Sequence, residues 1–173
     1  MNTPDADTRR ISRRLGLLAT LAFLALGWVS FDGALERRED PNRNLVVAPG
    51  ASELVLQRNR AGHYLLPGEI NGHPVRLLLD TGATQVSVPA RLAAELGLQA
   101  GAPASVRTAN GAVTVRQTRI PRLAFGPFEF RDVAGHLNPG MQGDEVLLGM
   151  SALRHLEFTQ RGDRLTLRAP GSG

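Results

Sequence analysis

The sequence contains no cysteine and no lysine among its 173 residues. The absence of cysteine excludes disulfide bonds, thiol nucleophiles and thiolate metal ligands. It leaves the cellular compartment open, because a chain without thiols is indifferent to redox conditions. Because lysine is absent, all 20 basic residues are arginine. Aromatic residues make up only 5% of the chain, so the core must be built mainly from leucine, valine and alanine.

The remaining composition is that of a globular protein, with 42% hydrophobic and 21% charged residues. The net charge is +4, but the arginines do not alternate with aromatic residues, so we expect no nucleic-acid partner. The four histidines show no metal-ligand spacing: His63, His73, His136 and His155. We therefore expect neither a metal nor a cofactor.

A run of 17 uncharged residues at positions 15–31 reads LGLLATLAFLALGWVSF. Arg13 and Arg14 precede it, and Trp28 lies near its far end, which predicts a transmembrane signal anchor. A cleaved signal peptide with Ala25-Leu26-Gly27 as its cleavage site is the alternative. Because the chain has one such run, we expect a single pass through the inner membrane. Basic residues adjoin only the N-terminal end of the run, which places that end on the cytoplasmic side. The body of the protein would then lie on the periplasmic or extracytoplasmic side.

The rest of the chain divides by composition. Residues 1–14 form a basic cytoplasmic N-terminus, and residues 32–51 are charged, contain prolines and predict a flexible tether. A single domain is expected over residues 52–169, followed by a disordered tail at 170–173.

Short strands separated by glycine and asparagine turns predict an all-β barrel or sandwich for this domain. Asn71-Gly72, Asn110-Gly111 and Gly162 mark hairpin turns. The adhesion-like tripeptide Arg161-Gly162-Asp163 is interpreted as part of the last of these turns. The strands are expected at 53–57, 63–70, 74–79, 86–88, 105–108, 113–115, 122–125, 128–133, 145–148, 156–160 and 164–168.

Two helices and one loop complete this prediction. A helix is expected over 89–96, since Pro89 begins it and Gly97 follows its end, and a shorter helix over 150–156. Residues 135–144 are interpreted as a long polar connecting loop.

The segment Asp80-Thr81-Gly82 is the main candidate for chemistry. It follows the apolar strand residues 77–79, which places a carboxylate where a buried strand ends. Gly82 permits close approach of another backbone. An aspartate that only caps a turn would give the same triplet, so the triplet alone does not decide. Ser87 and Ser151 lack the glycines of a nucleophile elbow, which argues against a serine hydrolase.

The order of motifs resembles that of retropepsin-like aspartic proteases, in particular their bacterial, membrane-anchored, single-domain branch. Asp80-Thr81-Gly82-Ala83 resembles the family's catalytic loop. The hairpin around Asn110-Gly111 resembles its flap, and Leu147-Leu148-Gly149 resembles the turn before its C-terminal helix. The resemblance covers residues 53–168 and implies a closed β-barrel with one or two short helices.

The resemblance also implies roles for individual residues. Asp80 would be the catalytic carboxylate of an aspartic endopeptidase, supported by Thr81, Gly82 and Ala83. Leu147, Leu148 and Gly149 would form the second turn. The flap residues that contact a polypeptide substrate would be Thr108, Ala109, Asn110, Gly111, Ala112 and Val113.

Aspartic proteolysis requires two carboxyl groups that share one proton across a water molecule. The chain carries one such motif, because Asp132, Asp144 and Asp163 lack the Thr-Gly sequel. We therefore expect a homodimer in which two copies of Asp80 meet at the two-fold axis. In the resemblance, Thr81 forms hydrogen bonds across that axis.

Two alternatives remain open at this stage. A catalytically inactive, membrane-tethered peptide-binding or scaffolding module of the same fold would bind polypeptides without cleaving them. A purely structural, membrane-tethered β-domain would tolerate replacement of Asp80. Dimerisation with paired copies of Asp80 distinguishes the protease from both.

Overall fold

The computed structural model describes residues 39–108 and 111–171. In this part of the chain the fold is all-β with one short α-helix, as predicted. The α-helix is α2 (Met150–Leu153), and a single 3-10 turn, η1, covers Ala90–Leu92. The strands are β1 (Glu53–Gln57), β2 (Leu65–Ile70), β3 (His73–Leu79), β4 (Val86–Pro89), β5 (Pro103–Thr108), β6 (Gly111–Phe125), β7 (Phe128–Asn138), β8 (Glu145–Leu148), β9 (Glu157–Arg161) and β10 (Arg164–Arg168).

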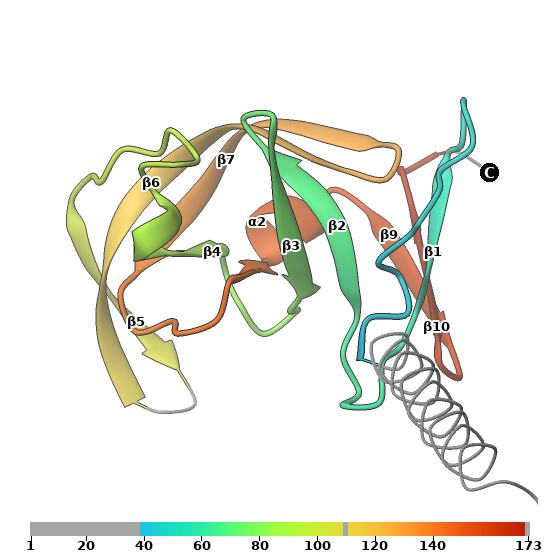
Figure 1. The fold of residues 1–173 in the computed structure, drawn as a ribbon, viewed down its shortest axis with the longest axis horizontal. Helices are drawn as coiled ribbons and strands as arrows, with labels where there is room; N and C mark the ends of the chain where they lie inside the picture. Colours follow the sequence, from blue (N-terminus) through green and yellow to red (C-terminus); the bar gives the residue numbers. More distant parts are fainter. Residues whose placement is uncertain (1–38, 109–110, 172–173) are drawn as a thin grey trace, which may run out of the picture. The chain divides into compact units, whose positions relative to one another are not determined.

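Seven strands form one sheet in the order β2-β3-β8-β4-β7-β6-β5. Strand β2 also pairs with β6, through Glu69 with Ala124 and Ile70 with Leu123, so the sheet closes into a barrel. Strands β1, β10 and β9 form a separate antiparallel sheet beside it (Figure 1). The closed barrel confirms the fold class that the motif order implied.

The hairpin turns follow from residues that adopt positive φ angles. Asn71 (φ 52°) and Gly72 (φ 83°) connect β2 to β3, as a two-residue turn of this composition requires. Gly162 (φ 58°) lies between β9 and β10. The Arg-Gly-Asp tripeptide therefore belongs to a hairpin, as interpreted from the sequence.

The core consists mainly of leucine and valine side chains from the barrel strands and α2. Burying each such side chain stabilises the fold by about 1.5–3 kcal/mol. Because these positions alternate along the strands, one face of each strand points into the core and the other is free to line a site. Fully buried examples are Leu66, Ile70, Leu77, Val86, Ile120, Leu123, Val146, Leu148 and Leu153.

The helix predicted over 89–96 is shorter in the structure. Only Ala90–Leu92 is helical, and turns continue from there to Gly97. The Leu98 N–H donates to the carbonyl of Ala93 (2.8 Å), and Gly97 takes a φ of 64°, so the chain reverses after little more than one turn. The second predicted helix is likewise reduced to Met150–Leu153, with turns up to Leu156.

Two further predictions are corrected. The predicted loop 135–144 begins later, because residues 135–138 continue β7 and pair in parallel with β4. The predicted strands at 113–115 and 122–125 belong to a single 15-residue strand, β6. In both places polar side chains on the outer face interrupt the apolar alternation on which the strand predictions relied.

The turn of the flap-like hairpin is also displaced by one residue. Thr108 pairs with Gly111, so Gly111 belongs to β6 rather than to the turn. The two positions between the strands are 109 and 110, which lie outside the described residues.

Part of the segment predicted as a tether packs on the barrel. The Asn42 side chain is buried; it donates to the carbonyls of Gln57 (2.9 Å) and Leu65 (2.7 Å) and accepts from the Gln57 N–H (2.8 Å). The predicted anchor at 15–31 lies outside the described residues, as do residues 1–14. Within the described ranges no helix is long and apolar enough to cross a membrane.

Candidate active site

Asp80 lies where β3 leaves the barrel sheet. Strand β3 runs parallel to β8, with Leu79 opposite Leu148, and the Asp80 N–H donates to the carbonyl of Leu148 (3.1 Å). This bond extends the parallel ladder by one residue and fixes the backbone of Asp80. Its side chain is only half-buried and is therefore accessible from outside the barrel.

The residues that follow Asp80 form a tight turn around its carboxylate. The Gly82 N–H donates to Asp80 Oδ1 (2.9 Å), and the Ala83 N–H donates to the Asp80 carbonyl (3.3 Å). A Cβ atom at Gly82 would lie 3.2 Å from Asp80 Oδ1, so glycine keeps this contact open. Thr81 is exposed, and its side chain forms no hydrogen bond with any described residue.

The turn at Leu147-Leu148-Gly149 packs against the backbone of the residues that follow Asp80. A Cβ atom on Gly149 would lie 2.3 Å from the carbonyl oxygen of Gln85 and 2.8 Å from that of Ala83. The Met150 N–H then donates to the carbonyl of Ala83 (2.8 Å), and the Ser151 N–H donates to the carbonyl of Thr84 (3.0 Å). The two motifs are thus joined backbone to backbone, which requires glycine at position 149.

Ser151 is a residue whose role the sequence did not indicate. Its hydroxyl accepts from the Val86 N–H (3.0 Å) and donates to the Ala134 carbonyl (2.8 Å). It therefore joins α2 to strands β4 and β7 just behind the Asp80 loop. No local pattern predicts this role, since both partners are distant backbone groups.

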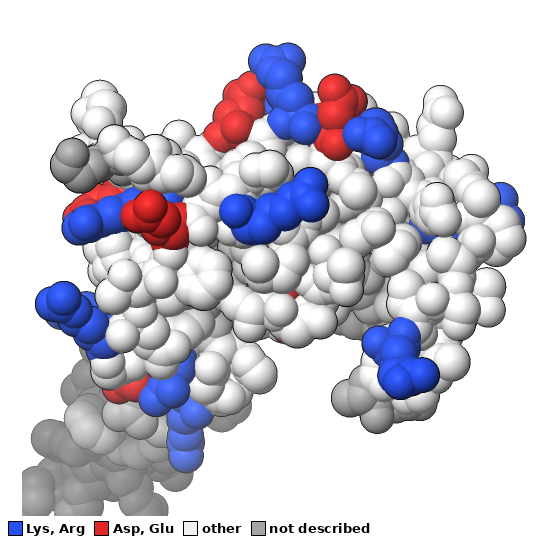
Figure 2. All heavy atoms as spheres, turned by 180° about the vertical axis from the view of Figure 1, so that it is seen from behind, with Lys and Arg blue, Asp and Glu red and all other residues white. Residues whose placement is uncertain are grey.

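A cavity of about 900 Å³ opens in front of Asp80. The Asp80 loop forms one wall and the β5 residues Ala104 to Thr108 form another. Figure 2 shows the molecule hollowed at its lower edge, between the β5–β6 hairpin and the body of the barrel. Side chains from four strands complete the lining: Ser87, Gln117, His136, Asn138 and Leu147.

Of the predicted flap residues, Thr108 lines this cavity, and its hydroxyl donates to the Gly111 carbonyl (2.9 Å) across the hairpin. Gly111, Ala112 and Val113 belong to β6 but are not among the lining residues. Ala109 and Asn110 lie outside the described residues.

The comparisons with known proteins decide the family. The family model described as "gag-polyprotein putative aspartyl protease" matches residues 66–155, just over half of the chain. The chain belongs to this family of retropepsin-like aspartyl proteases. A crystal structure of a retropepsin-like aspartic protease from Rickettsia conorii is 29% identical, with a TM-score of 0.58. The match covers 68% of this chain and 90% of that one.

Two curated relatives of this retropepsin-like chain bear names that describe them as uncharacterised proteins. A protein encoded in the cobV 5′ region of a Sinorhizobium species is 31% identical over 137 residues, which cover 74% of this chain and 58% of the relative. A Rickettsia prowazekii protein is 28% identical over 108 residues, covering 61% of this chain and 46% of the relative. The match thus spans about half the length of these relatives.

The cavity of this retropepsin-like domain carries little charge. Among the described lining residues Asp80 is the only acid and Arg107 the only arginine. Burial lowers the pKa of His136 below its usual value of 6.5, which favours the neutral imidazole. On the face shown in Figure 2, the charged side chains of the described residues are scattered among uncharged ones. No described group of three or more His, Asp or Glu side chains is arranged to hold a metal ion.

A separate hollow, distinct from the cavity described above, also borders the Asp80 loop. It is lined by Asp80 and Thr81 together with Phe158 and Gln160 of β9. All five residues of β9 are exposed, and Phe158 keeps 46% of its surface accessible. The edge strand of the small sheet therefore presents an apolar ring beside the candidate catalytic loop. Tyr64, Leu79 and Leu165 complete the lining.

Proposed function

We propose that the protein is an aspartic endopeptidase whose catalytic pair consists of Asp80 from each of two copies of the chain. The observation that carries this proposal is the position of Asp80. Its carboxylate is held by the Gly82 N–H at the edge of a cavity whose opposite wall is the β5 strand of a hairpin.

The chemistry needs a second carboxyl group next to Asp80. In the proposed pair, one Asp80 carboxylate accepts a proton from a bound water, and the protonated partner donates to the oxygen of the scissile carbonyl. Attack of the water forms a tetrahedral intermediate, and transfer of a proton to the leaving amine completes the cleavage. Asp80 is the only described acid that lines the cavity of one chain, so the second carboxyl group is assigned to another copy.

We propose the exposed face beside Thr81 as the surface on which the two copies meet. Thr81 is exposed and without a side-chain partner among the described residues, and Phe158 lies next to it. Strand β9 is one of the two edge strands of its sheet, and such edges pair readily with a second strand. A two-fold axis close to Thr81 would bring the two Asp80 loops together.

The proposed substrate is a polypeptide in extended conformation. Strand β5 lies at the end of the strand order of the barrel sheet, so its outer backbone groups have no strand partner in that sheet. An extended peptide in the cavity can add to such an edge through main-chain hydrogen bonds.

We also propose that residues 15–31 anchor the protein in the inner membrane, with the protease domain on the extracytoplasmic side. The support is the uncharged run and its basic N-terminal flank. Retention of the full chain in membranes after alkaline extraction is the expected result. Release of a shortened chain would favour a cleaved signal peptide.

Cleavage of an unstructured protein substrate by purified protein, across mildly acidic to neutral pH, tests the proposed activity. Asp80→Asn removes the proton-accepting carboxylate at nearly constant volume and should lower the rate by at least about 100-fold. Asp163→Asn, at the exposed β9–β10 turn, is the matched control and should retain activity. Equal cleavage by wild type and Asp80→Asn would exclude the assignment, and loss of circular dichroism in Asp80→Asn would show a folding defect instead.

A further inference from the structure

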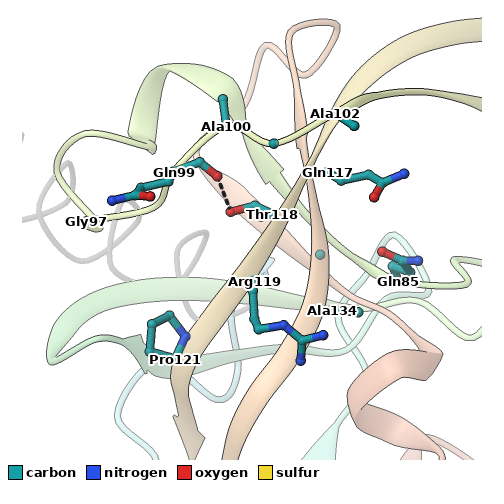
Figure 3. A pocket seen from close by; sticks show the side chains of 12 residues that line it. Gln85, Gly97, Gln99, Ala100, Ala102, Gln117, Thr118, Arg119, Pro121 and Ala134 are labelled. Carbon is teal, nitrogen blue, oxygen red and sulfur yellow. Dashed lines mark hydrogen bonds between the residues drawn. The ribbon is translucent and has the colours of Figure 1, made fainter.

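A second pocket, of about 580 Å³, adjoins the cavity of Asp80. Gln85 and Gln117 line both spaces and therefore lie at the boundary between them. On one side the pocket is bounded by residues 97–102 and on the other by strands β6 and β7 (Figure 3). The Thr118 hydroxyl donates to the Gln99 carbonyl (2.8 Å) and fixes the first wall to β6.

Strand register relates the two spaces. Ser87 pairs with His136, and His136 with Gln117, so these three side chains form one row across β4, β7 and β6 in the first cavity. Arg119 pairs with Ala134 in the next row that faces the same way, and both line the second pocket. Two residues along a strand correspond to about 6.6–6.8 Å.

This spacing matches an extended peptide. Side chains at positions i and i+2 of a peptide in β conformation point to the same side and are also about 6.6–6.8 Å apart. A substrate that places one side chain against the row of His136 and Gln117 can therefore place another, two residues away, next to Arg119.

Arg119 gives the second pocket its chemical character. Among the described residues that line the pocket, Arg119 is the only charged one, and the polar groups around it are the neutral side chains of Gln85, Gln99, Gln117 and Thr118. Figure 3 shows its guanidinium group extending to the same side as Gln85 and Gln117. Arg119 Nη1 donates to the Asp132 carbonyl (2.7 Å), which holds the side chain in place.

The guanidinium group has unused binding capacity. Arg119 forms no ion pair with any described residue, and a guanidinium group carries five N–H donors in a planar fork. A carboxylate fits this fork better than an amide or a hydroxyl group, because it accepts two parallel charge-assisted hydrogen bonds.

We infer that this pocket is a further substrate subsite that takes an acidic side chain, Asp or Glu, of the bound polypeptide. The inference rests on the proposed protease function. It adds a preference for a carboxylate two residues away from the side chain that occupies the His136 row.

Cleavage of a proteome-derived peptide library by the full chain tests this subsite. Wild type should enrich Asp and Glu at one fixed position relative to the cleaved bond, by about two- to fivefold, the range of an exposed ion pair. Arg119→Glu should reverse this preference to Lys and Arg at that position. Arg116→Glu, an equal charge change at an exposed position that lines neither space, should leave it unchanged. A profile identical in wild type and Arg119→Glu would overturn the inference.

A binding measurement separates this inference from the proposed activity. Two fluorescent peptide pools that differ only in Glu or Gln at one position are titrated onto Asp80→Asn protein, which needs no catalysis. The Glu pool should bind about two- to fivefold more tightly, and Arg119→Gln in the same background should remove the difference. Equal binding of the two pools would reject the subsite even if the protein is a protease. If no library peptide is cleaved, the proposed function fails while this result still decides the subsite.

Discussion

The backbone N–H of Asp80 donates to the carbonyl oxygen of Leu148 over 3.1 Å. This bond joins two segments that lie 68 positions apart in the sequence, one with the candidate catalytic carboxylate and one with the turn before α2. The parallel pairing of Leu79 with Leu148 lies directly beside it. The position of the Asp80 carboxylate therefore depends on the geometry of the Leu148-Gly149 turn.

Replacement of Gly149 by alanine should destabilise the fold through this turn. The new Cβ atom would lie 2.3 Å from the Gln85 carbonyl oxygen, so the backbone of the Asp80 loop must shift. We expect a loss of about 1–3 kcal/mol in the free energy of unfolding, measured by urea denaturation. Gly143→Ala is the matched control, because its closest neighbour is the flexible end of the Glu145 side chain. Equal stability of the two variants would contradict the tight packing at Gly149.

Asn42 should be required for full stability although it lies in a segment that the sequence presented as a tether. Asn42→Ala leaves the Gln57 N–H and the Leu65 carbonyl without these hydrogen bonds, which should cost about 1–3 kcal/mol. Asn42→Asp should cost more, because a carboxylate oxygen would then face two carbonyl oxygens. Urea denaturation measures both, with Asn44→Ala, at an exposed position of the same segment, as the reference. If a chain that begins at Ser52 is as stable as one that begins at Glu39, Asn42 has no such role.

The stability of the domain should fall in mild acid because of His136. Burial lowers the pKa of this imidazole below 6.5, so the unfolded chain binds the proton more strongly than the folded one. The free energy of unfolding should therefore decrease as the pH falls below about 6.5, and His136→Gln should show a smaller decrease. The hydrogen bond from Arg122 lowers the pKa of Glu129 below its usual value of 4.5. The stability that this carboxylate contributes is therefore lost only at a lower pH, where it becomes protonated. Superimposable pH profiles of wild type and His136→Gln would contradict this assignment.

Local patterns predicted the parts of the site that depend on residue type. The Asp80-Thr81-Gly82 turn and the Asn71-Gly72 hairpin each follow from what aspartate, asparagine and glycine do in turns. Gly149 was likewise singled out as part of the Leu147-Leu148-Gly149 motif. In each case the side chain, or its absence, determines the local backbone conformation.

The sequence could not reveal features that depend on strand register. The row of Ser87, His136 and Gln117 exists because three strands distant in sequence pair in one alignment. Polar residues on this outer face also obscured the strand character of residues 135–138. The role of Ser151 was hidden for a related reason, since its partners are backbone groups that any residue can supply.

The central claim, a catalytic pair formed by Asp80 from two chains, is tested most directly by mixing. An equal amount of Asp80→Asn protein is added to active wild type and left to exchange subunits, and the rate of substrate cleavage is compared with wild type alone. If every active dimer needs two copies of Asp80, random pairing should reduce the rate to about half, while Asp163→Asn added in the same way should not reduce it. A rate unaffected by Asp80→Asn, with exchange verified by differently labelled chains, would contradict the shared catalytic pair.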